Sequence, residues 1–306
     1  MKQIKPMCAD RASLEDLEYY FNSEDYIAEP KYDGARYVMQ IADKDIYLTS
    51  RRVSLKGGGM CEKSANVPHI TSFQKLPILK DYIGTILDGE IVSPKKNLIS
   101  VMSVMGASPE TAIEYQEENG LVDYFVFDIL EYKGEDVRKM PFSLRRELLE
   151  RIFRIGSWGN IRLTPQVIEK KEEYYHKIIK EGGEGVVLKN LAGTYIEDSR
   201  PKRNWLKVKR VDTFDGIVIG GKEGNGKYRG NLGALIIGQY VNDKLQEVAT
   251  ISGMTDAQRA EFWNRIKRGE QWVVEFAAQE KTPYFRYRHP QYKRCRPDKN
   301  QRSCVW

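Results

Sequence analysis

The amino-acid sequence predicts an α+β fold in two domains, an N-terminal domain of antiparallel sheets with helices and a small C-terminal β-barrel. Over residues 26–210, short β-rich runs follow one another without regularly intervening helices, which favours antiparallel pairing. After residue 212 the pattern changes to short apolar runs between Gly-rich turns, which is typical of small barrels. The sequence has no internal repeat or low-complexity segment that would indicate another architecture.

The N-terminal domain is expected to span residues 1–211. Its β-rich runs, bounded by Gly, Pro and Asp as strands commonly are, cover 26–33, 35–42, 45–51, 85–93, 123–130 and 185–190. Helices are expected at 14–21 and 143–155. In the second helix Ser143 is the expected N-cap, and Leu144, Leu148 and Ile152 recur at the spacing of one helix face.

The C-terminal domain is expected to span residues 212–306. Its expected strands cover 216–224, 234–240, 245–252 and 272–279. One helix is expected at 256–268, with Thr255 as its N-cap. Short strands, Gly-rich turns and a single helix suit a barrel of the OB type, and an SH3-like barrel fits almost as well.

Composition excludes several classes of protein. The chain has 306 residues, 41% hydrophobic and 30% charged, which is enough for two ordinary domains with real cores. It lacks the roughly 18 consecutive apolar residues of a membrane span and the apolar region of a secretory signal. Four dispersed cysteines and three histidines make disulfide scaffolds and zinc ribbons improbable. We therefore expect a soluble cytoplasmic protein in which any metal has oxygen ligands.

Basic residues are concentrated in two segments. The net charge is +6, from 49 basic and 43 acidic residues. Residues 200–210 carry six Lys or Arg and no acid, and residues 281–306 carry eight against the single acid Asp298. Basic runs interleaved with aromatic residues are typical of polyanion binding. Solvated faces or a disordered tail would have the same composition, so charge alone leaves both interpretations open.

One motif resembles a phosphate-binding P-loop without meeting its requirements. Residues 221–227, GKEGNGK, have the GxxxxGK spacing, but Tyr228 stands where the metal-binding Ser or Thr belongs. The sequence that follows predicts a turn entering a strand, whereas a P-loop needs a helix N-terminus. We interpret this segment as a hairpin loop.

Lys31 is the first candidate catalytic residue. It lies in the sequence EPKYDGAR, between two expected strands. A lysine set into a mostly buried sheet loses solvation and its pKa falls, as an amine nucleophile requires. The alternative is an edge-strand lysine that pairs with Asp33 or Glu29, and the motif alone does not decide between them.

Further short motifs follow Lys31 in a fixed order. They are TSRR (49–52), LDGE (87–90), FVFD (125–128), EGVVLK (184–189), WLKVK (205–209) and RCRPDK (294–299). This series resembles the covalent nucleotidyltransferase superfamily of DNA ligases, RNA ligases and mRNA-capping enzymes. The flanking residues are similar to ATP-dependent DNA ligases of the small bacterial, archaeal and phage type, including the ligase module of bacterial end-joining enzymes. The resemblance covers almost the whole chain and implies a nucleotidyltransferase (adenylation) domain followed by an OB-fold domain.

The resemblance also implies roles for residues near the nucleotide. Lys31 would form a covalent lysyl-AMP, and Glu90 and Glu184 would bind Mg²⁺, which Mn²⁺ could replace. Phe127 would stack on adenine, and Glu29 would help to orient the base. The remaining nucleotide contacts, to ribose or phosphates, would come from basic residues: Arg36, Arg51, Lys207 and Lys209.

Residues of the second domain and of the basic runs are implied in the later steps. Arg296 and Asp298 would orient the β- and γ-phosphates, which requires domain motion about a hinge at 210–214, with Asp212 as the candidate. Nucleic-acid contacts are expected from six basic residues: Arg52, Arg203, Arg210, Arg288, Lys293 and Arg294.

The function that the resemblance implies is ATP-dependent sealing of 3′-hydroxyl/5′-phosphate nicks in duplex DNA by a monomer in a bacterial, archaeal or phage-infected cell. The chain has no room before Lys31 for the extra domain of NAD-dependent ligases, which favours ATP. Two alternatives stay open. One is an RNA ligase or capping guanylyltransferase, and the other is a nucleic-acid-binding module without catalysis.

Overall fold

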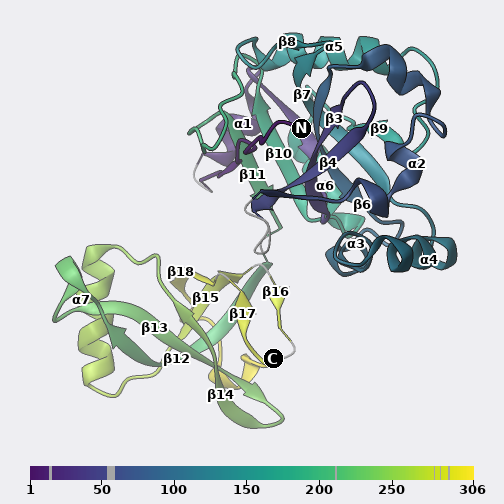
Figure 1. Ribbon diagram of the computed structural model, residues 1–306. Helices are drawn as coiled ribbons and strands as arrows, with labels where there is room; N and C mark the ends of the chain where they lie inside the picture. Colours follow the sequence, from purple (N-terminus) through teal and green to yellow (C-terminus); the bar gives the residue numbers. More distant parts are fainter. Residues whose placement is uncertain (14–15, 54–58, 211, 279, 283, 289) are drawn as a thin grey trace. The chain divides into compact units, whose positions relative to one another are not determined.

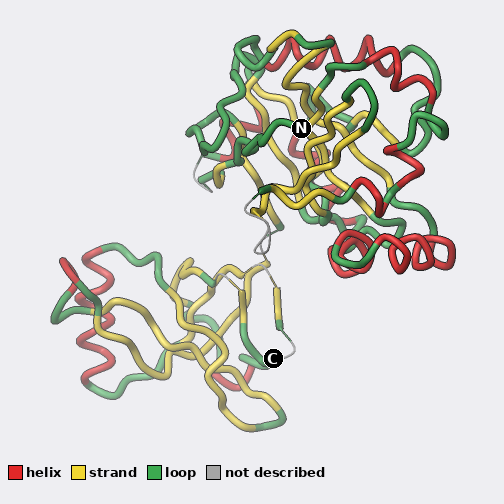
Figure 2. The backbone as a smooth tube through the Cα atoms, viewed as in Figure 1, coloured by secondary structure: helices red, strands yellow, loops and turns green. Residues whose placement is uncertain are grey.

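A computed structural model describes residues 1–306 except 14–15, 54–58, 211, 279, 283 and 289. The chain forms two compact units, Met1–Lys209 and Arg210–Trp306. The boundary expected from the sequence, after residue 211, lies close to the division after Lys209. In the first unit the strands occupy the middle and helices lie around them (Figures 1 and 2).

The larger sheet of the first unit carries seven strands. Six of them pair in the order β5-β4-β3-β6-β7-β8, and β9 pairs with β7 in parallel. Their bounds are β3 (Ala35–Ile41), β4 (Ile46–Val53), β5 (Met60–Glu62), β6 (Ile86–Val92), β7 (Asp123–Tyr132), β8 (Glu135–Asp136) and β9 (Ile161–Leu163). The predicted antiparallel pairing is confirmed for the central strands β3, β4, β6 and β7.

The smaller sheet carries four strands in the order β1-β11-β10-β2. They are β1 (Asp10–Arg11), β11 (Trp205–Lys209), β10 (Gly185–Asn190) and β2 (Tyr26–Pro30). One hydrophobic cluster joins the two sheets, because it combines Val38, Ile86 and Leu130 of the larger sheet with Trp205 and Val187 of the smaller one. One face of each sheet therefore turns toward the other.

In the part of the first unit that the structure describes, six α-helices lie around these sheets, most of them on the larger sheet. They are α1 (Leu17–Asn22), α2 (Pro68–Thr71), α3 (Leu98–Met105), α4 (Pro109–Asn119), α5 (Phe142–Phe153) and α6 (Lys171–Lys180), with two 3-10 turns, η1 (Ser64–Asn66) and η2 (Pro77–Tyr82). The expected helix at 14–21 corresponds to α1, although residues 14–15 lie outside the described residues. The other expected helix corresponds to α5, and the remaining four helices were not predicted.

Helix α5 differs from its prediction at the N-cap and on its buried face. Its N-cap is Pro141 rather than Ser143, which lies inside the first turn. Leu144 is 44% exposed, whereas Arg145 is fully buried. Arg145 forms a two-pronged ion pair with Asp128 of β7, at 2.7 Å from Nε and 2.8 Å from Nη2. The predicted apolar stripe is confirmed for Ile152, which is buried, and for Leu148, which packs against the core. It was wrong for Leu144, because the buried side chain next to it is that of Arg145.

The second unit is a barrel of the OB type. Its main sheet has the order β14-β13-β12-β15-β18, with a short hairpin beside it. The elements are β12 (Asp212–Glu223), η3 (Gly226–Tyr228), β13 (Leu232–Val241), β14 (Lys244–Ile251), α7 (Asp256–Lys267), β15 (Val273–Ala278), β16 (Glu280–Lys281), β17 (Tyr287–Arg288), β18 (Gln291–Cys295) and η4 (Gln301–Ser303).

Two local predictions for the second unit are confirmed. Thr255 caps α7, because its hydroxyl accepts from the Gln258 N–H. The Gln258 side chain accepts from the Thr255 N–H in turn, and the two bonds form a capping box. Residues 221–223 end β12 and residues 224–227 begin its connection to the antiparallel strand β13, which includes the 3-10 turn η3, as the hairpin interpretation predicted. Among the described helices, none is both long and apolar enough to cross a membrane.

Replacement of Arg145 by methionine should destabilise the chain strongly. Arg145 and Asp128 are both fully buried, and removing one partner of such a pair costs about 3–5 kcal/mol because an unpaired charge is left behind. We expect a loss of this size in the free energy of unfolding measured by urea denaturation. The matched control is Arg154→Ala on the same helix, whose side chain is 77% exposed and should change stability by less than about 0.5 kcal/mol. Equal small effects would contradict the structural role of Arg145.

Candidate active site

The smaller sheet brings Lys31, Glu184 and Lys209 together. Lys31 follows β2, and its N–H donates to the Gly185 carbonyl at 2.9 Å. Gly185 is opposite Lys209 in the register of β10 and β11. The Lys31 ammonium lies 2.5 Å from Glu184 Oε2, and Lys209 pairs with the other oxygen, Oε1. One carboxylate thus bridges two lysines, and all three side chains are half-buried.

The electrostatics of this centre favour an added anion. Burial opposes ionisation of Glu184, but the charges of Lys31 and Lys209 outweigh it and lower its pKa. Lys207 lies two residues from Lys209 on the same face of β11. Burial lowers the pKa of Lys207, and the nearby cations Arg200 and Lys209 add to this effect. Two lysines share the Glu184 carboxylate and Lys207 lies near them, so the centre can accept further negative charge.

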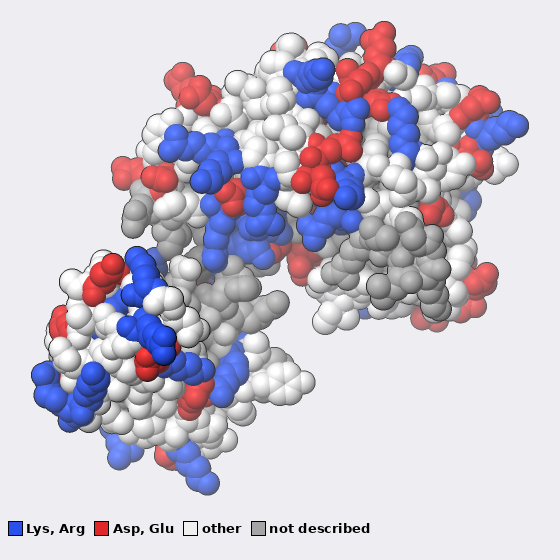
Figure 3. Space-filling view, turned by 60° about the vertical axis from the view of Figure 1, so that its left-hand side comes forward, with Lys and Arg blue, Asp and Glu red and all other residues white. Residues whose placement is uncertain are grey.

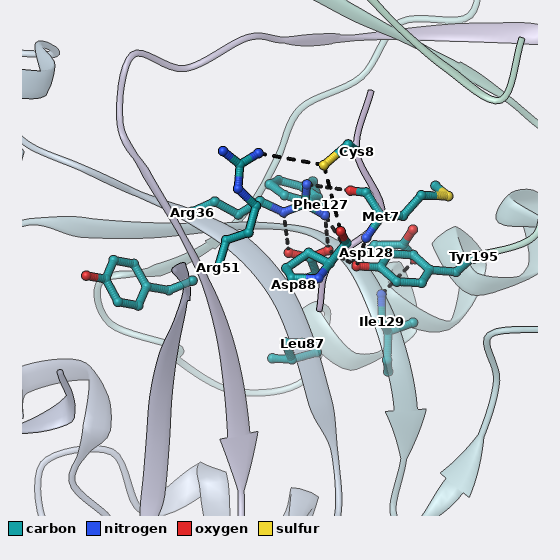
Figure 4. A network of polar contacts seen from close by, with 12 residues as sticks. Met7, Cys8, Arg36, Arg51, Leu87, Asp88, Phe127, Asp128, Ile129 and Tyr195 are labelled. Atoms are coloured by element: carbon teal, nitrogen blue, oxygen red, sulfur yellow. Dashed lines mark hydrogen bonds and ion pairs between the residues drawn. The ribbon is translucent and has the colours of Figure 1, made fainter. Parts of the chain in front are cut away.

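The larger sheet adds Arg36, Asp88 and Glu90. Arg36 is opposite Glu90 in the register of β3 and β6. Its guanidinium binds Asp88 through both carboxylate oxygens, at 2.9 and 2.5 Å, and donates to the Met7 carbonyl at 2.6 Å. The Tyr195 hydroxyl donates to Asp88 at 2.7 Å, and Figure 4 shows this network. Sequence reasoning missed the roles of Asp88 and Tyr195, although Asp88 lies in the LDGE motif and within the expected strand 85–93, which corresponds to β6.

Glu90 is a carboxylate with an unusual pKa. Burial raises its pKa from 4.5 to about 7, although the charges of Arg36 and Lys31 act in the opposite direction. Glu184 is near enough to contribute to the same rise. The two acids that the sequence indicated as metal ligands therefore interact electrostatically: Glu90 lies on β6 of the larger sheet, and Glu184 directly precedes β10 of the smaller one.

Phe127 and Glu29 are connected by Lys189, which sequence reasoning did not single out. The Lys189 ammonium donates to the Phe127 carbonyl and pairs with Glu29 Oε2, both at 2.7 Å. The Phe127 ring lies at 5.8 Å from the Trp205 ring, edge to face, and at 5.2 Å from the Arg36 guanidinium carbon. Glu29 Oε1 is buried without a hydrogen-bond partner in the described part of the chain. Lys189 is the last residue of the EGVVLK motif, so the sequence motif already included it.

A basic cleft of about 360 Å³ lies beside this centre. Arg51 lines it and its Nη1 lies 3.6 Å from the Cys8 sulfur (Figure 4). The side chains around it include three cations and one acid: Lys5, Pro6, Cys8, Arg51, Met60, Asp198, Ser199 and Arg200. Figure 3 shows Lys and Arg gathered in clusters on the visible face of the first unit. The backbone of Arg52 lies on β4, but its side chain is outside the described residues.

Arg296 and Asp298 lie in the second unit within a network of charges. Asp298 accepts from Arg296 Nη2 at 2.8 Å, and Asp215 accepts from Nη1 at 3.0 Å. Arg294 pairs with Glu275 at 2.6 Å, and Lys293 is exposed on the same strand, β18.

The other residues predicted to contact nucleic acid are distributed over both units. Arg203 is exposed in the first unit, and Arg210, at the start of the second, pairs with Asp212 at 2.9 Å. The side chain of Arg288 is outside the described residues.

The donor set at the first centre fits Mg²⁺ better than a transition metal. Within the described ranges, no group of three or more His, Cys, Asp or Glu side chains forms a ready metal cage. Mg²⁺ is commonly bound by one or two carboxylates together with water and substrate phosphates. Glu90 and Glu184 are two carboxylates that interact electrostatically in this centre, so they would supply the protein oxygen ligands of such a site.

The two-sheet domain followed by an OB-type barrel is the fold of nucleotidyltransferase ligases. The ligase domain of M. tuberculosis LigD has this fold with a TM-score of 0.55 and 21% identity, over 99% of this chain and 98% of that chain. Residues 6–209 match the family ATP dependent DNA ligase domain. The chain therefore belongs to the ATP-dependent DNA ligase domain family.

Curated relatives agree with this assignment. DNA ligase 1 of Methanosarcina acetivorans is 30% identical over 287 residues, covering 85% of this chain and 47% of the relative. The probable DNA ligase of Aquifex aeolicus is 31% identical over 252 residues, covering 78% of this chain and 41% of the relative. The chain spans less than half the length of these two relatives.

The raised pKa of Glu90 predicts a pH-dependent stability. The folded protein holds a proton on Glu90 that the unfolded chain releases above about pH 4.5, so stability should fall as pH rises from 4.5 to about 7. Urea denaturation in EDTA across this range should show that Glu90→Gln, which does not titrate, lacks this part of the slope. Identical slopes of stability against pH for the wild type and Glu90→Gln would contradict the raised pKa of Glu90.

Proposed function

We propose that this chain seals nicks in duplex DNA with ATP, through a covalent AMP on Lys31. The observation that carries the proposal is the Lys31–Glu184–Lys209 centre, in which a half-buried lysine lies beside a carboxylate and further cations. The chain belongs to an ATP-dependent ligase family, which supports ATP as the nucleotide. The activity is a proposal because the chain spans only part of its relatives.

In the first step the Lys31 nitrogen attacks the α-phosphorus of ATP. A P–N bond forms, the P–O bond to the β-phosphate breaks, and pyrophosphate leaves. Glu184, at 2.5 Å, is placed to accept the proton that the ammonium must lose. Lys207 and Lys209 would stabilise charge on the α-phosphate, which is the main task in phosphoryl transfer. When bound between Glu90 and Glu184, Mg²⁺ would neutralise phosphate charge.

The later steps would occur on DNA. The 5′-phosphate at the nick displaces Lys31 from AMP, and the 3′-hydroxyl then attacks this phosphate and releases AMP. We propose that Arg51, for which the resemblance implies a nucleotide contact, also holds the DNA phosphate with its basic cleft, because three cations face one acid there. The exposed cations Arg203, Lys293 and Arg294 would contact the backbone elsewhere.

The second unit would assist the first step. We propose that Arg296 and Asp298 orient the departing phosphates, with residues 210–214, including Asp212, as the hinge. Arg296 would have to exchange its carboxylate partner Asp215 for phosphate oxygens, a like-for-like change of anionic ligand. We further propose that the protein is monomeric and acts in the cytoplasm, where its DNA substrate lies.

Lys31 should be required for adduct formation. After removal of bound AMP with pyrophosphate, incubation with ATP and Mg²⁺ should raise the intact mass by one AMP in the wild type and not in Lys31→Ala. Lys31→Ala should still seal a nick that is already adenylylated, because the third step does not need the nucleophile. A GMP adduct from GTP would instead favour a capping enzyme, and no adduct from any nucleotide would contradict the proposal.

Arg51 should contribute one phosphate contact to DNA binding. Arg51→Ala should weaken binding of a nicked duplex and reduce the slope of log affinity against log salt by about one. The measurement is fluorescence anisotropy at several salt concentrations. Arg154→Ala, which removes an exposed arginine from α5, is the matched control and should leave the slope unchanged. Equal slopes for all three proteins would contradict a phosphate contact at Arg51.

A further inference from the structure

The short hairpin of the second unit carries an aromatic side chain that lies almost wholly in water. The hairpin consists of β16 and β17 and connects β15 to β18, the fourth and fifth strands of the main sheet in chain order. Tyr284, between β16 and β17, is 85% exposed, and its neighbour Phe285 is 39% exposed. An aromatic ring with this exposure has both a large apolar surface and a polar tip available to a ligand.

The tip of the hairpin has a defined shape. The Thr282 N–H donates to the Arg286 carbonyl at 2.8 Å, and the Arg286 side chain is tied to β14 by an ion pair at 3.1 Å. Phe285 adopts the left-handed backbone conformation, with φ at 55°, which is unfavourable for an aromatic residue. Its ring packs edge to face on Trp306, with 5.6 Å between the ring centres. These contacts hold the tip in a conformation that leaves Tyr284 exposed.

Trp306 connects this tip to strand β13. Its ring centre lies 4.7 Å from the Lys281 ammonium, and its N–H donates to the Tyr240 carbonyl at 3.0 Å. The Arg302 guanidinium carbon lies 5.0 Å from the Tyr240 ring centre. Figure 1 shows the hairpin beside the C-terminus. We call this connected group the aromatic strip, and its members are Lys281, Tyr284, Phe285, Trp306, Tyr240 and Arg302.

The aromatic strip lies on the part of the barrel that binds nucleic acids in other OB folds. Such folds bind oligonucleotides on the face of their second and third strands and with the loop between their fourth and fifth strands. Here β13 is the second strand of the barrel, and the hairpin stands between the fourth and the fifth. None of the six residues takes part in the function proposed above.

The chemistry of the aromatic strip suits unpaired nucleotides better than a duplex. In a duplex the faces of the bases are covered by their neighbours, whereas in a single strand they are free to stack on an aromatic ring. Tyr284 and Phe285 are exposed rings, and Lys281 and Arg302 are exposed cations that can neutralise phosphates. Rings and cations in one continuous surface are the combination that binds single strands without sequence preference.

We propose that the aromatic strip binds single-stranded nucleic acid, with an unpaired base stacked on Tyr284 and the adjoining phosphates beside Lys281 and Arg302. All six residues belong to the second unit, and the binding needs neither a nucleotide nor an adduct on Lys31. The inference therefore goes beyond nick sealing and does not depend on it. It gives the chain a contact for an unpaired segment of its DNA.

Tyr284→Ala should weaken the binding of an oligothymidylate of about 12 nucleotides by about tenfold, because stacking on one base is lost. The measurement is fluorescence anisotropy of the labelled oligonucleotide at several salt concentrations. The slope of log affinity against log salt should not change, because tyrosine neutralises no phosphate, whereas Lys281→Met should reduce this slope by about 0.7. Tyr284→Phe, which keeps the ring, should retain most of the affinity.

Two further probes separate base stacking from a contact with the backbone. An abasic oligonucleotide of the same length has the same phosphates and no base faces, and a fully paired nicked duplex has bases that are already stacked. Tyr284→Ala should change the affinity for either probe by less than about twofold. Equal losses with the single strand, the abasic strand and the duplex would overturn the inference, and so would an unchanged affinity for the single strand.

Tyr19→Ala is the matched control, because Tyr19 is a 61% exposed tyrosine on α1 of the first unit. Both tyrosines are exposed, so neither substitution should disturb the fold. Tyr19→Ala should leave all three affinities unchanged, and a loss equal to that of Tyr284→Ala would overturn the inference. Absence of an AMP adduct in the wild type would contradict the proposed function and would leave these binding results unaffected.

Discussion

Charged side chains that lie between the two sheets of the first unit must be paired, and this constraint organises the domain. Moving an isolated charge from water into a protein interior costs several kcal/mol, so each buried charge requires a partner at close range. Arg145 pairs with Asp128, Arg36 with Asp88, and Lys189 with Glu29. Each pair joins two different elements, α5 with β7, β3 with β6 and β10 with β2, and so holds these elements together.

The ion pairs differ in their access to water, and this difference distinguishes the pairs that stabilise the fold from the pair in the active site. Arg145 and Asp128 are completely buried and are suited to holding α5 on β7. Lys31 and Glu184 are each 23% exposed, so their partners can be exchanged for a substrate. Glu29 is buried and pairs with Lys189 and Arg146, so it belongs with the structural pairs by its access to water. The same electrostatic rule thus produces a rigid support and a reactive centre.

Sequence reasoning predicted the strands and the barrel well, because the β-rich runs and their Gly and Pro boundaries are local signals. It also predicted Lys31, Glu184 and Lys209, which the structure brings together. It predicted α5 but missed the burial of Arg145 and Arg146, because their partners Asp128 and Glu29 lie on β7 and β2 and no periodicity within the helix reveals them. The roles of Lys189 and Asp88, which lie in the EGVVLK and LDGE motifs, were missed for the same reason.

The central claim is that Lys31 is the lysine that reacts. The most direct measurement is the location of the nucleotide adduct by tandem mass spectrometry of peptides from the protein incubated with ATP and Mg²⁺, under conditions that preserve an acid-labile phosphoramidate. The account predicts AMP on Lys31 and none on Lys207 or Lys209, which should contact phosphate without forming a bond. An adduct on either of these lysines, with Lys31 unmodified, would contradict it.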